Sequence, residues 1–122
     1  MNVVDSSGWL EYLAEGSKSD VFEEPLKDLD SLIVPVICLY EVFKVVLRER
    51  GEQDALQAAA LMKQGKVVEV SEEIALRAAQ ISHRDKLPMA DSLILATAHA
   101  CGAILWTKDS DFKGMDGVRY FE

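Results

Sequence analysis

Residues 88–111 read PMADSLILATAHACGAILWTKDSD and contain the longest uncharged run of the chain together with three acidic residues. The uncharged run, residues 92–107, has 16 residues and is interrupted by His99 and Gly102. It is shorter than the roughly 18–20 apolar residues that a membrane span requires. Because Pro88 is typical of a helix start and Gly102 of a helix end, the stretch predicts a buried helix over 88–100 and a buried strand over 103–107.

Other short apolar runs, each bounded by polar residues, predict further strands. The expected strands are residues 2–5, 32–35, 67–70 and 103–107, with 118–121 as a fifth if the sheet extends that far. Strands that are apolar on both faces and alternate with helices indicate a parallel sheet covered on both sides. We therefore expect one α/β domain over residues 1–122, a central parallel sheet of four to five strands flanked by helices on both faces.

Capping and stop residues divide the remaining chain into helices. Ser6-Ser7-Gly8 is expected to cap the first helix, which Gly16 ends. Pro25 is expected at a break or in the first turn of the second helix, and the charged residues 83–87 are expected to form a loop. The helices after the first are expected over residues 21–29, 36–50, 52–63, 71 to about 82, and 88–100.

The composition is that of an ordinary globular domain, with 122 residues, 49% hydrophobic and 28% charged. It excludes a disordered or collagen-like chain. The first residues lack the basic and long apolar segments of a secretory signal, and Cys38 and Cys101 form no CxxC pair. We therefore expect reduced cysteines, a cytoplasmic location and no membrane association. The net charge of −8 argues against binding nucleic acid by phosphate neutralisation, unless the acids gather in a cation site.

Five acidic residues are expected to meet at one edge of the sheet. Asp5 ends the first strand, and Asp109 and Asp111 follow the fourth. Glu41 and Asp91 lie in early turns of the helices that begin after Pro35 and at Pro88. The carboxyl ends of parallel strands and the starts of the following helices share one edge, where ligand sites form.

Each of these acids also has a purely structural interpretation. Asp5 could cap the first helix, Asp91 could lie favourably near the positive end of a helix dipole, and the acids after the fourth strand could form an ordinary turn. Glu41 projects from a mostly apolar helix face and therefore needs a partner, either Lys44 or a bound cation.

The clustered acids favour a site for a hard divalent cation. Neighbouring carboxylates repel one another and raise their own pKa values unless a positive charge lies among them. Mg²⁺ and Mn²⁺ prefer carboxylate and water oxygens, whereas the isolated His83 and His99 give no zinc-binding spacing. Such a site suits phosphoryl chemistry, because the ions generate hydroxide from bound water and stabilise the attacking and leaving oxygens. The acidic net charge then no longer excludes a nucleic-acid substrate.

Four motifs occur in order along nearly the whole chain: VVDSS (3–7), YEV (40–42), ADSLILATA (90–98) and WTKDSDF (106–112). The last two are the more specific. Together the motifs resemble those of the PIN-domain ribonucleases, in particular the VapC-type toxins of bacterial and archaeal toxin–antitoxin pairs.

The resemblance implies a metal site made by Asp5, Glu41, Asp91 and Asp109, with Asp111 as a frequent further member. It implies that Mg²⁺, or Mn²⁺ as its substitute, supports endonucleolytic hydrolysis of single-stranded or structured RNA to 5′-phosphate and 3′-hydroxyl ends. In this interpretation Asp5, Asp91 and Asp109 are direct or water-mediated ligands. Glu41 completes the cage or helps to deprotonate the water.

Polar and basic neighbours of the acids receive supporting roles from the same resemblance. Ser7, which stands where many family members have Asn, and Thr107 are the supporting polar residues. Taken singly, each basic residue nearby is more often a solvated charge than a ligand contact. The candidate RNA phosphate contacts are Arg84, Lys86, Lys108 and Lys113.

The resemblance also implies protein partners. A member of this family would form a homodimer and would be inhibited by a cognate antitoxin. The antitoxin would insert a C-terminal segment toward the acids, often through an arginine that pairs with the carboxylates. An apolar set in the first two helices could form a groove for that segment or could simply be core: Trp9, Tyr12, Val21 and Phe22.

Three alternatives differ in what the acids do. A receiver-like phosphoacceptor domain has a similar size and α/β pattern, but it needs an acid pair after the first strand and an acceptor Asp where Ser71 stands. A haloacid-dehalogenase-like phosphatase needs an Asp at Ser7. The third alternative is a metal-free interaction module whose acids bind a basic partner.

Overall fold

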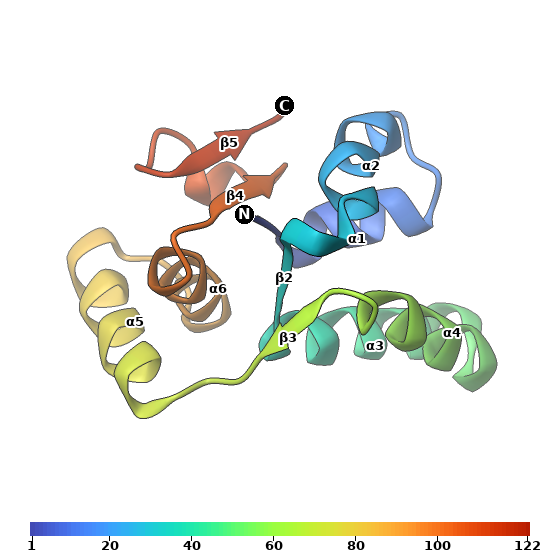
Figure 1. Ribbon diagram of the computed structural model, residues 1–122, viewed down its shortest axis with the longest axis horizontal. Coiled ribbons are helices and arrows are strands. Elements are labelled where there is room, and N and C mark those ends of the chain that lie inside the picture. The colour runs from blue at the N-terminus through green and yellow to red at the C-terminus, as the bar shows by residue number, and fades with distance from the viewer.

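Five parallel strands make the central sheet in the computed structural model, which describes residues 1–122 (Figure 1). All neighbouring pairs are parallel, so the carboxyl ends of the strands lie at one edge of the sheet. The order across the sheet is β3-β2-β1-β4-β5. The strands are β1 (Asn2–Val4), β2 (Leu32–Pro35), β3 (Lys66–Val68), β4 (Ile104–Thr107) and β5 (Val118–Tyr120).

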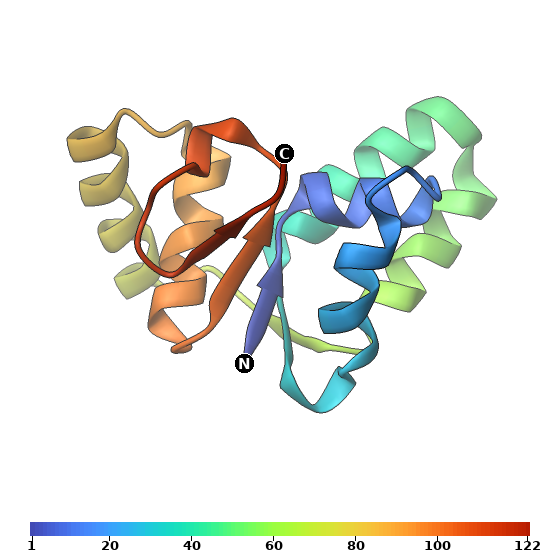
Figure 2. The same cartoon turned by 90° about the horizontal axis from the view of Figure 1, so that it is seen from above.

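Six α-helices connect and cover the strands. Helices α3 and α4 pack together as one pair and α5 and α6 as another, and Figures 1 and 2 show these pairs at opposite ends of the molecule. None of the helices is both long enough and apolar enough to cross a membrane. The helices are α1 (Ser6–Leu13), α2 (Ser19–Lys27), α3 (Val36–Arg50), α4 (Glu52–Met62), α5 (Glu72–Asp85) and α6 (Met89–Ala100), with short 3-10 turns η1 (Leu29–Ser31) and η2 (Ser110–Phe112).

The inner strands are buried on both faces. Successive side chains of a strand point to opposite faces of the sheet. Val3 and Val4 of β1 are both inaccessible to solvent, and residues 32–34 of β2 are almost completely buried. Leu105 of β4 is buried in the same core. The apolar runs seen in the sequence therefore form the middle of a sheet that has helices on both sides.

The predicted fold class is confirmed, including the fifth strand. The predicted bounds 32–35 and 36–50 match β2 and α3. The third strand ends at Val68 rather than residue 70, because Glu69 and Val70 are exposed and lead to Ser71, whose hydroxyl caps α5 by accepting from the Ile74 N–H.

Two local predictions were wrong. The charged loop expected over residues 83–87 begins later, because His83, Arg84 and Asp85 form the last turn of α5, where a helix dipole favours basic side chains. The second helix covers residues 19–27 rather than 21–29, and Pro25 lies inside it instead of at a break or in its first turn. Pro25 is buried within α2, where its missing N–H leaves one helical backbone hydrogen bond unmade.

The strand order rules out the receiver-like alternative and locates the site region. A receiver-type sheet has the order 2-1-3-4-5, whereas here β1 lies between β2 and β4. The chain runs outward from β1 to β3 and then returns to place β4 on the other side of β1. The switch point, where ligands bind in open parallel sheets, is therefore at the carboxyl ends of β1 and β4.

A glycine at the start of α1 permits the close approach of this helix to the core. A Cβ built on Gly8 would lie 2.5 Å from Val4 Cγ1 and 2.8 Å from Phe22 Cε1. Both neighbours are fully buried and cannot move aside without disturbing other core contacts.

We predict that Gly8→Ala destabilises the protein by about 1–3 kcal/mol, because overpacking outweighs the gain of about 1 kcal/mol that alanine usually brings to a helix. The measurement is the free energy of unfolding in urea. Ala60→Ser, which adds one heavy atom at an exposed position of α4, is the control and should change it by less than about 0.5 kcal/mol. A Gly8→Ala protein more stable than the wild type would contradict this account of the packing.

Candidate metal centre

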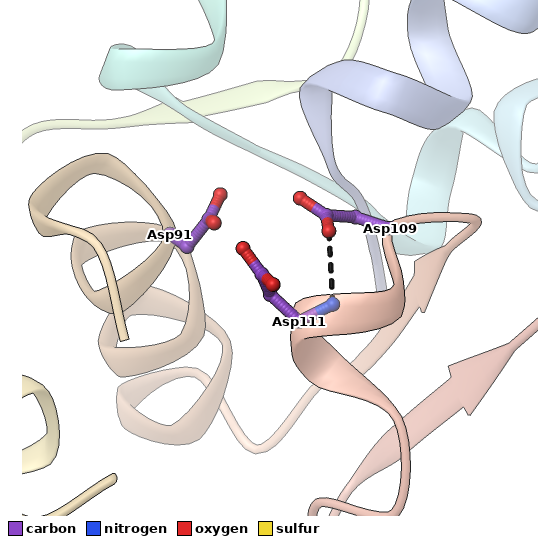
Figure 3. A group of neighbouring side chains, drawn as sticks. All are labelled: Asp91, Asp109 and Asp111. Atoms are coloured by element: carbon purple, nitrogen blue, oxygen red, sulfur yellow. Dashed lines mark hydrogen bonds between the residues drawn. The ribbon is translucent and has the colours of Figure 1, made fainter. Parts of the chain in front are cut away.

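Three aspartates converge on one small space at the switch point (Figure 3). Asp91 lies in the first turn of α6, while Asp109 and Asp111 follow β4. One carboxylate oxygen from each lies within 4.8 Å of the others. Figure 3 shows the Asp91 and Asp111 side chains approaching from opposite sides, with Asp109 beside them. We call Asp91, Asp109 and Asp111 the aspartate trio.

The turn after β4 fixes the two aspartates that it carries. Asp109 caps the short turn η2, since its Oδ1 accepts a hydrogen bond of 2.9 Å from the Asp111 N–H. The Asp109 N–H in turn donates to the hydroxyl oxygen of Thr107 at 2.9 Å. Backbone groups therefore hold Asp109 and Asp111 in a fixed relation to the end of β4.

Asp5 lies outside the aspartate trio, is almost completely buried and accepts three hydrogen bonds. Its Oδ1 accepts from the Ser7 hydroxyl (2.7 Å) and the Gly8 N–H (2.9 Å), and its Oδ2 accepts from the Thr107 hydroxyl (2.6 Å). The cap of α1 is thus Asp5, and the prediction that Ser6 and Ser7 would provide it was wrong. Asp5 can still accept a further contact, because a carboxylate offers about four lone-pair directions.

The Thr107 hydroxyl connects the acid of β1 with those of β4. It donates its proton to Asp5 Oδ2 and accepts from the Asp109 N–H, and it is itself fully buried. Ser7 supports the same junction, since its hydroxyl lies 3.4 Å from that of Thr107 and accepts from the Lys108 N–H at 3.3 Å. Both predicted supporting residues therefore lie in the hydrogen-bond network of the acids.

Glu41 is half-buried on α3 and is held by Ser6. The Ser6 hydroxyl donates to Glu41 Oε1 at 2.6 Å. Of the two partners considered for Glu41, Lys44 forms no salt bridge with it, because the Lys44 ammonium lies over the Tyr40 ring. Sequence reasoning missed Ser6, although its place directly after the first strand, beside Asp5, was a usable signal.

Burial and mutual repulsion raise the pKa values of two of these acids. Burial is the largest cause of the rise in the pKa of Asp91 to about 7, followed by the negative charges of Asp109, Asp5, Glu41 and Asp111. The pKa of Asp5 is also raised, because its burial outweighs the hydrogen bonds that favour the carboxylate. A cation among these oxygens would relieve both effects, and an all-oxygen donor set suits Mg²⁺ or Mn²⁺.

The four basic residues predicted to contact RNA phosphates differ in the contacts that they make in the structure. Arg84, in the last turn of α5, pairs with the adjacent Asp85, and Lys86 ends that helix in a left-handed conformation. Lys108 is bonded to Glu11 of α1 through a 2.8 Å contact that sequence reasoning missed. Lys113 lies over the ring of Tyr120.

Comparison with known proteins identifies a family model that covers nearly all of the chain. The model of the PIN domain matches residues 3–118. A comparison with curated proteins gave no match.

Solved structures of low sequence identity share the fold along their whole length. A chain of a toxin–antitoxin complex from Klebsiella pneumoniae is 24% identical with a TM-score of 0.79, covering 98% of this chain and 96% of that one. The VapC20 toxin of Mycobacterium tuberculosis is 18% identical with a TM-score of 0.78, covering 95% of each chain. A chain of VapBC2 from Rickettsia felis is 14% identical with a TM-score of 0.77, covering 99% and 98%.

We predict that Thr107→Val lowers the free energy of unfolding by about 1–3 kcal/mol, because Asp5 and the Asp109 N–H each lose a buried partner. Urea unfolding measures the effect. Thr97→Val is the matched control, since the buried Thr97 hydroxyl donates only to the Leu93 carbonyl within α6. Equal losses in the two variants would contradict a special role of the Thr107 hydroxyl.

The raised pKa of Asp91 predicts that the metal-free protein loses stability as pH rises. Between about pH 4 and 7 the folded chain holds a proton on Asp91 that the unfolded chain has released, so the free energy of unfolding decreases with pH over that window. Asp91→Asn should flatten the dependence and raise the stability at pH 7. The test is urea unfolding in EDTA at pH 5, 6 and 7.

Asp20→Asn is the control for this pH series, because Asp20 also lies in the first turn of a helix but is exposed on α2. It should keep the wild-type pH dependence. An Asp91→Asn protein whose stability falls with pH as steeply as that of the wild type would place the titrating group elsewhere.

Proposed function

Because the chain belongs to the PIN domain family, we propose that it is a divalent-metal-dependent endoribonuclease and the toxin of a VapBC-type toxin–antitoxin pair. The observation that carries the proposal is the aspartate trio at the switch point, backed by the buried Asp5. Burial and the neighbouring carboxylates raise the pKa of Asp91 to about 7, and a cation held among these oxygens would offset that cost.

The names of the structural relatives support the same activity. One is a toxin–antitoxin complex, and another is described as a toxin that cleaves the sarcin–ricin loop. At 24% and 18% identity these relatives show a common fold with this chain. A common activity is therefore part of the proposal. The site chemistry adds a reason of its own, since oxygen-only ligands suit metal-assisted phosphodiester hydrolysis.

In the proposed reaction, Asp5, Asp91 and Asp109 hold the cation directly or through water, and Asp111 is a further ligand. When bound, Mg²⁺ or Mn²⁺ supplies a hydroxide-forming water and neutralises charge on the phosphate. Hydrogen bonds from Thr107 and Ser7 orient Asp5 and favour its carboxylate form. Glu41, aligned by Ser6, completes the cage or accepts the proton of the water. Hydrolysis of the bond between phosphorus and the 3′ oxygen would leave 5′-phosphate and 3′-hydroxyl ends.

The proposal includes a cognate antitoxin, a homodimer, a cytoplasmic location and a catalytic domain that spans residues 1–122. Phe22 is a core residue, and Trp9 and Tyr12 line only a small pocket of about 220 Å³ beside Leu26 of α2. A different cleft of about 540 Å³ lies between α1, α3 and α4 and is lined by apolar side chains that include Leu10, Val46 and Leu61. This cleft suits the amphipathic segment of an antitoxin.

The test is cleavage of a labelled RNA pool by the purified protein with Mg²⁺, with Mn²⁺ and with EDTA. We expect cleavage with either ion and none in EDTA. Asp91→Asn should lower the rate by about 100-fold or more, because it removes a charged ligand. Asp20→Asn, an exposed acid of α2, should cleave like the wild type.

Cleavage that persists in Asp91→Asn would contradict the site assignment. If neither protein cleaves, titration of Mn²⁺ by calorimetry separates the two remaining interpretations. Binding of Mn²⁺ by the wild type but not by Asp91→Asn supports a metal site with a narrow substrate range. Equal, negligible heats for both would favour the metal-free acidic interaction module.

A further inference from the structure

A polar cleft of about 820 Å³ opens directly beside the aspartate trio. Its walls are α5, α6 and the segment that follows η2, residues 113–116. Asp111 belongs both to the wall of this cleft and to the trio. A polymer bound in the cleft would therefore reach the acids without leaving the protein surface.

Basic side chains line both walls of the cleft. Arg77 and Arg84 are seven residues apart on α5, so they lie on one face of the helix and about 10.5 Å apart along its axis. Lys113 lines the opposite wall. Gln80, between the two arginines, and His99 of α6 add groups that can hydrogen-bond to ribose or base edges.

The two arginines are available to an anionic ligand. Arg77 is exposed and forms no salt bridge. Arg84 pairs only with the neighbouring Asp85 on the surface, and such exposed pairs contribute little stability. A phosphate can therefore replace Asp85 at the Arg84 guanidinium, where it would gain a charge-assisted contact.

The cleft also contains the acidic residues Asp85, Asp111 and Asp116. With Asp111 assigned to the proposed cation site, the basic residues Arg77, Arg84 and Lys113 outnumber Asp85 and Asp116 by one. The placement of these basic groups along both walls points to a ligand with repeated negative charges and polar sugars and bases. An RNA strand has this chemistry, and its backbone must continue on at least one side of the phosphate that is cut.

We propose that this cleft holds the RNA strand on one side of the scissile phosphate, with Arg77 and Arg84 contacting different phosphates of that strand. The inference rests on the proposed nuclease function and deepens it by assigning the path of the substrate. It adds Arg77 to the residues that the sequence suggested. It also selects Arg84 and Lys113 over Lys86 and over Lys108, which is bonded to Glu11.

The experiment compares two double variants that remove the same charge. The test variant, Arg77→Ala/Arg84→Ala, removes both arginines from the cleft. The control, Arg48→Ala/Arg50→Ala, removes two arginines from the last turn of α3, away from the cleft. Binding of a fluorescent single-stranded RNA oligonucleotide is measured by anisotropy in EDTA, over a series of KCl concentrations. EDTA prevents cleavage under the proposed function, so binding is measured alone.

We expect the cleft variant to raise the Kd about tenfold at low salt and to reduce the slope of log K against log salt by about 1.4, the value for two lost phosphate contacts on a single strand. Arg77→Lys/Arg84→Lys should recover most of the salt slope. The α3 variant should stay within about twofold of the wild type. Equal losses in the cleft and α3 variants, or no loss in either, would overturn the proposal.

A second probe separates RNA from an acidic protein segment. If the cleft variant binds RNA like the wild type but loses affinity for a glutamate-rich peptide, the cleft belongs to a protein partner and the proposal is wrong. Failure of the nuclease function would look different. The wild type would then cleave no RNA with Mg²⁺ or Mn²⁺, while the cleft variant would still bind RNA more weakly than the α3 variant.

Discussion

The parallel pairing of β1 with β4 is the constraint on which the rest of the structure depends. Val4 lies opposite Trp106, and the Asp5 N–H donates to the Trp106 carbonyl at 3.1 Å, so the two strands end level with each other. Asp5 consequently meets Thr107, whose hydroxyl joins it to the Asp109 N–H. Since α1 is capped by Asp5 and η2 by Asp109, this one junction also determines where the next two elements begin.

The same junction concentrates negative charge in a poorly hydrated place. Hydrogen bonds from Ser7, Gly8 and Thr107 favour the ionised form of Asp5, yet burial still raises its pKa. No such hydrogen bonds favour the ionised form of Asp91. Burial and the repulsion of four neighbouring acids raise its pKa to about 7. Carboxylates with raised pKa values lower the stability of the folded chain at neutral pH. Functional sites commonly show such a loss of stability.

The basic residues on the α1 side of the acids differ in their pairing from those on the α5 side. On the side of α1, Lys108 is bonded to Glu11 and its charge is compensated. On the side of α5, the arginines line an open cleft that includes Asp111 in its wall. On the α1 side the basic charge is therefore paired with an acid, whereas on the α5 side the arginines can attract an anionic polymer. Under the proposed nuclease function, this asymmetry would let a chain with a net charge of −8 present a local surface suited to RNA.

Local patterns in the sequence were enough to predict the element types and the sheet edge at which the acids meet. The run over residues 92–107 is too apolar to be exposed, and proline and glycine mark its boundaries, so local chemistry was enough to predict α6 and β4. Three features became visible only in the folded chain: the strand order, the Ser6–Glu41 contact across 35 positions, and the presence of Arg77 and Asp111 in one cleft. These depend on which strands pair and in which register, and no local pattern encodes a choice made by packing between distant segments.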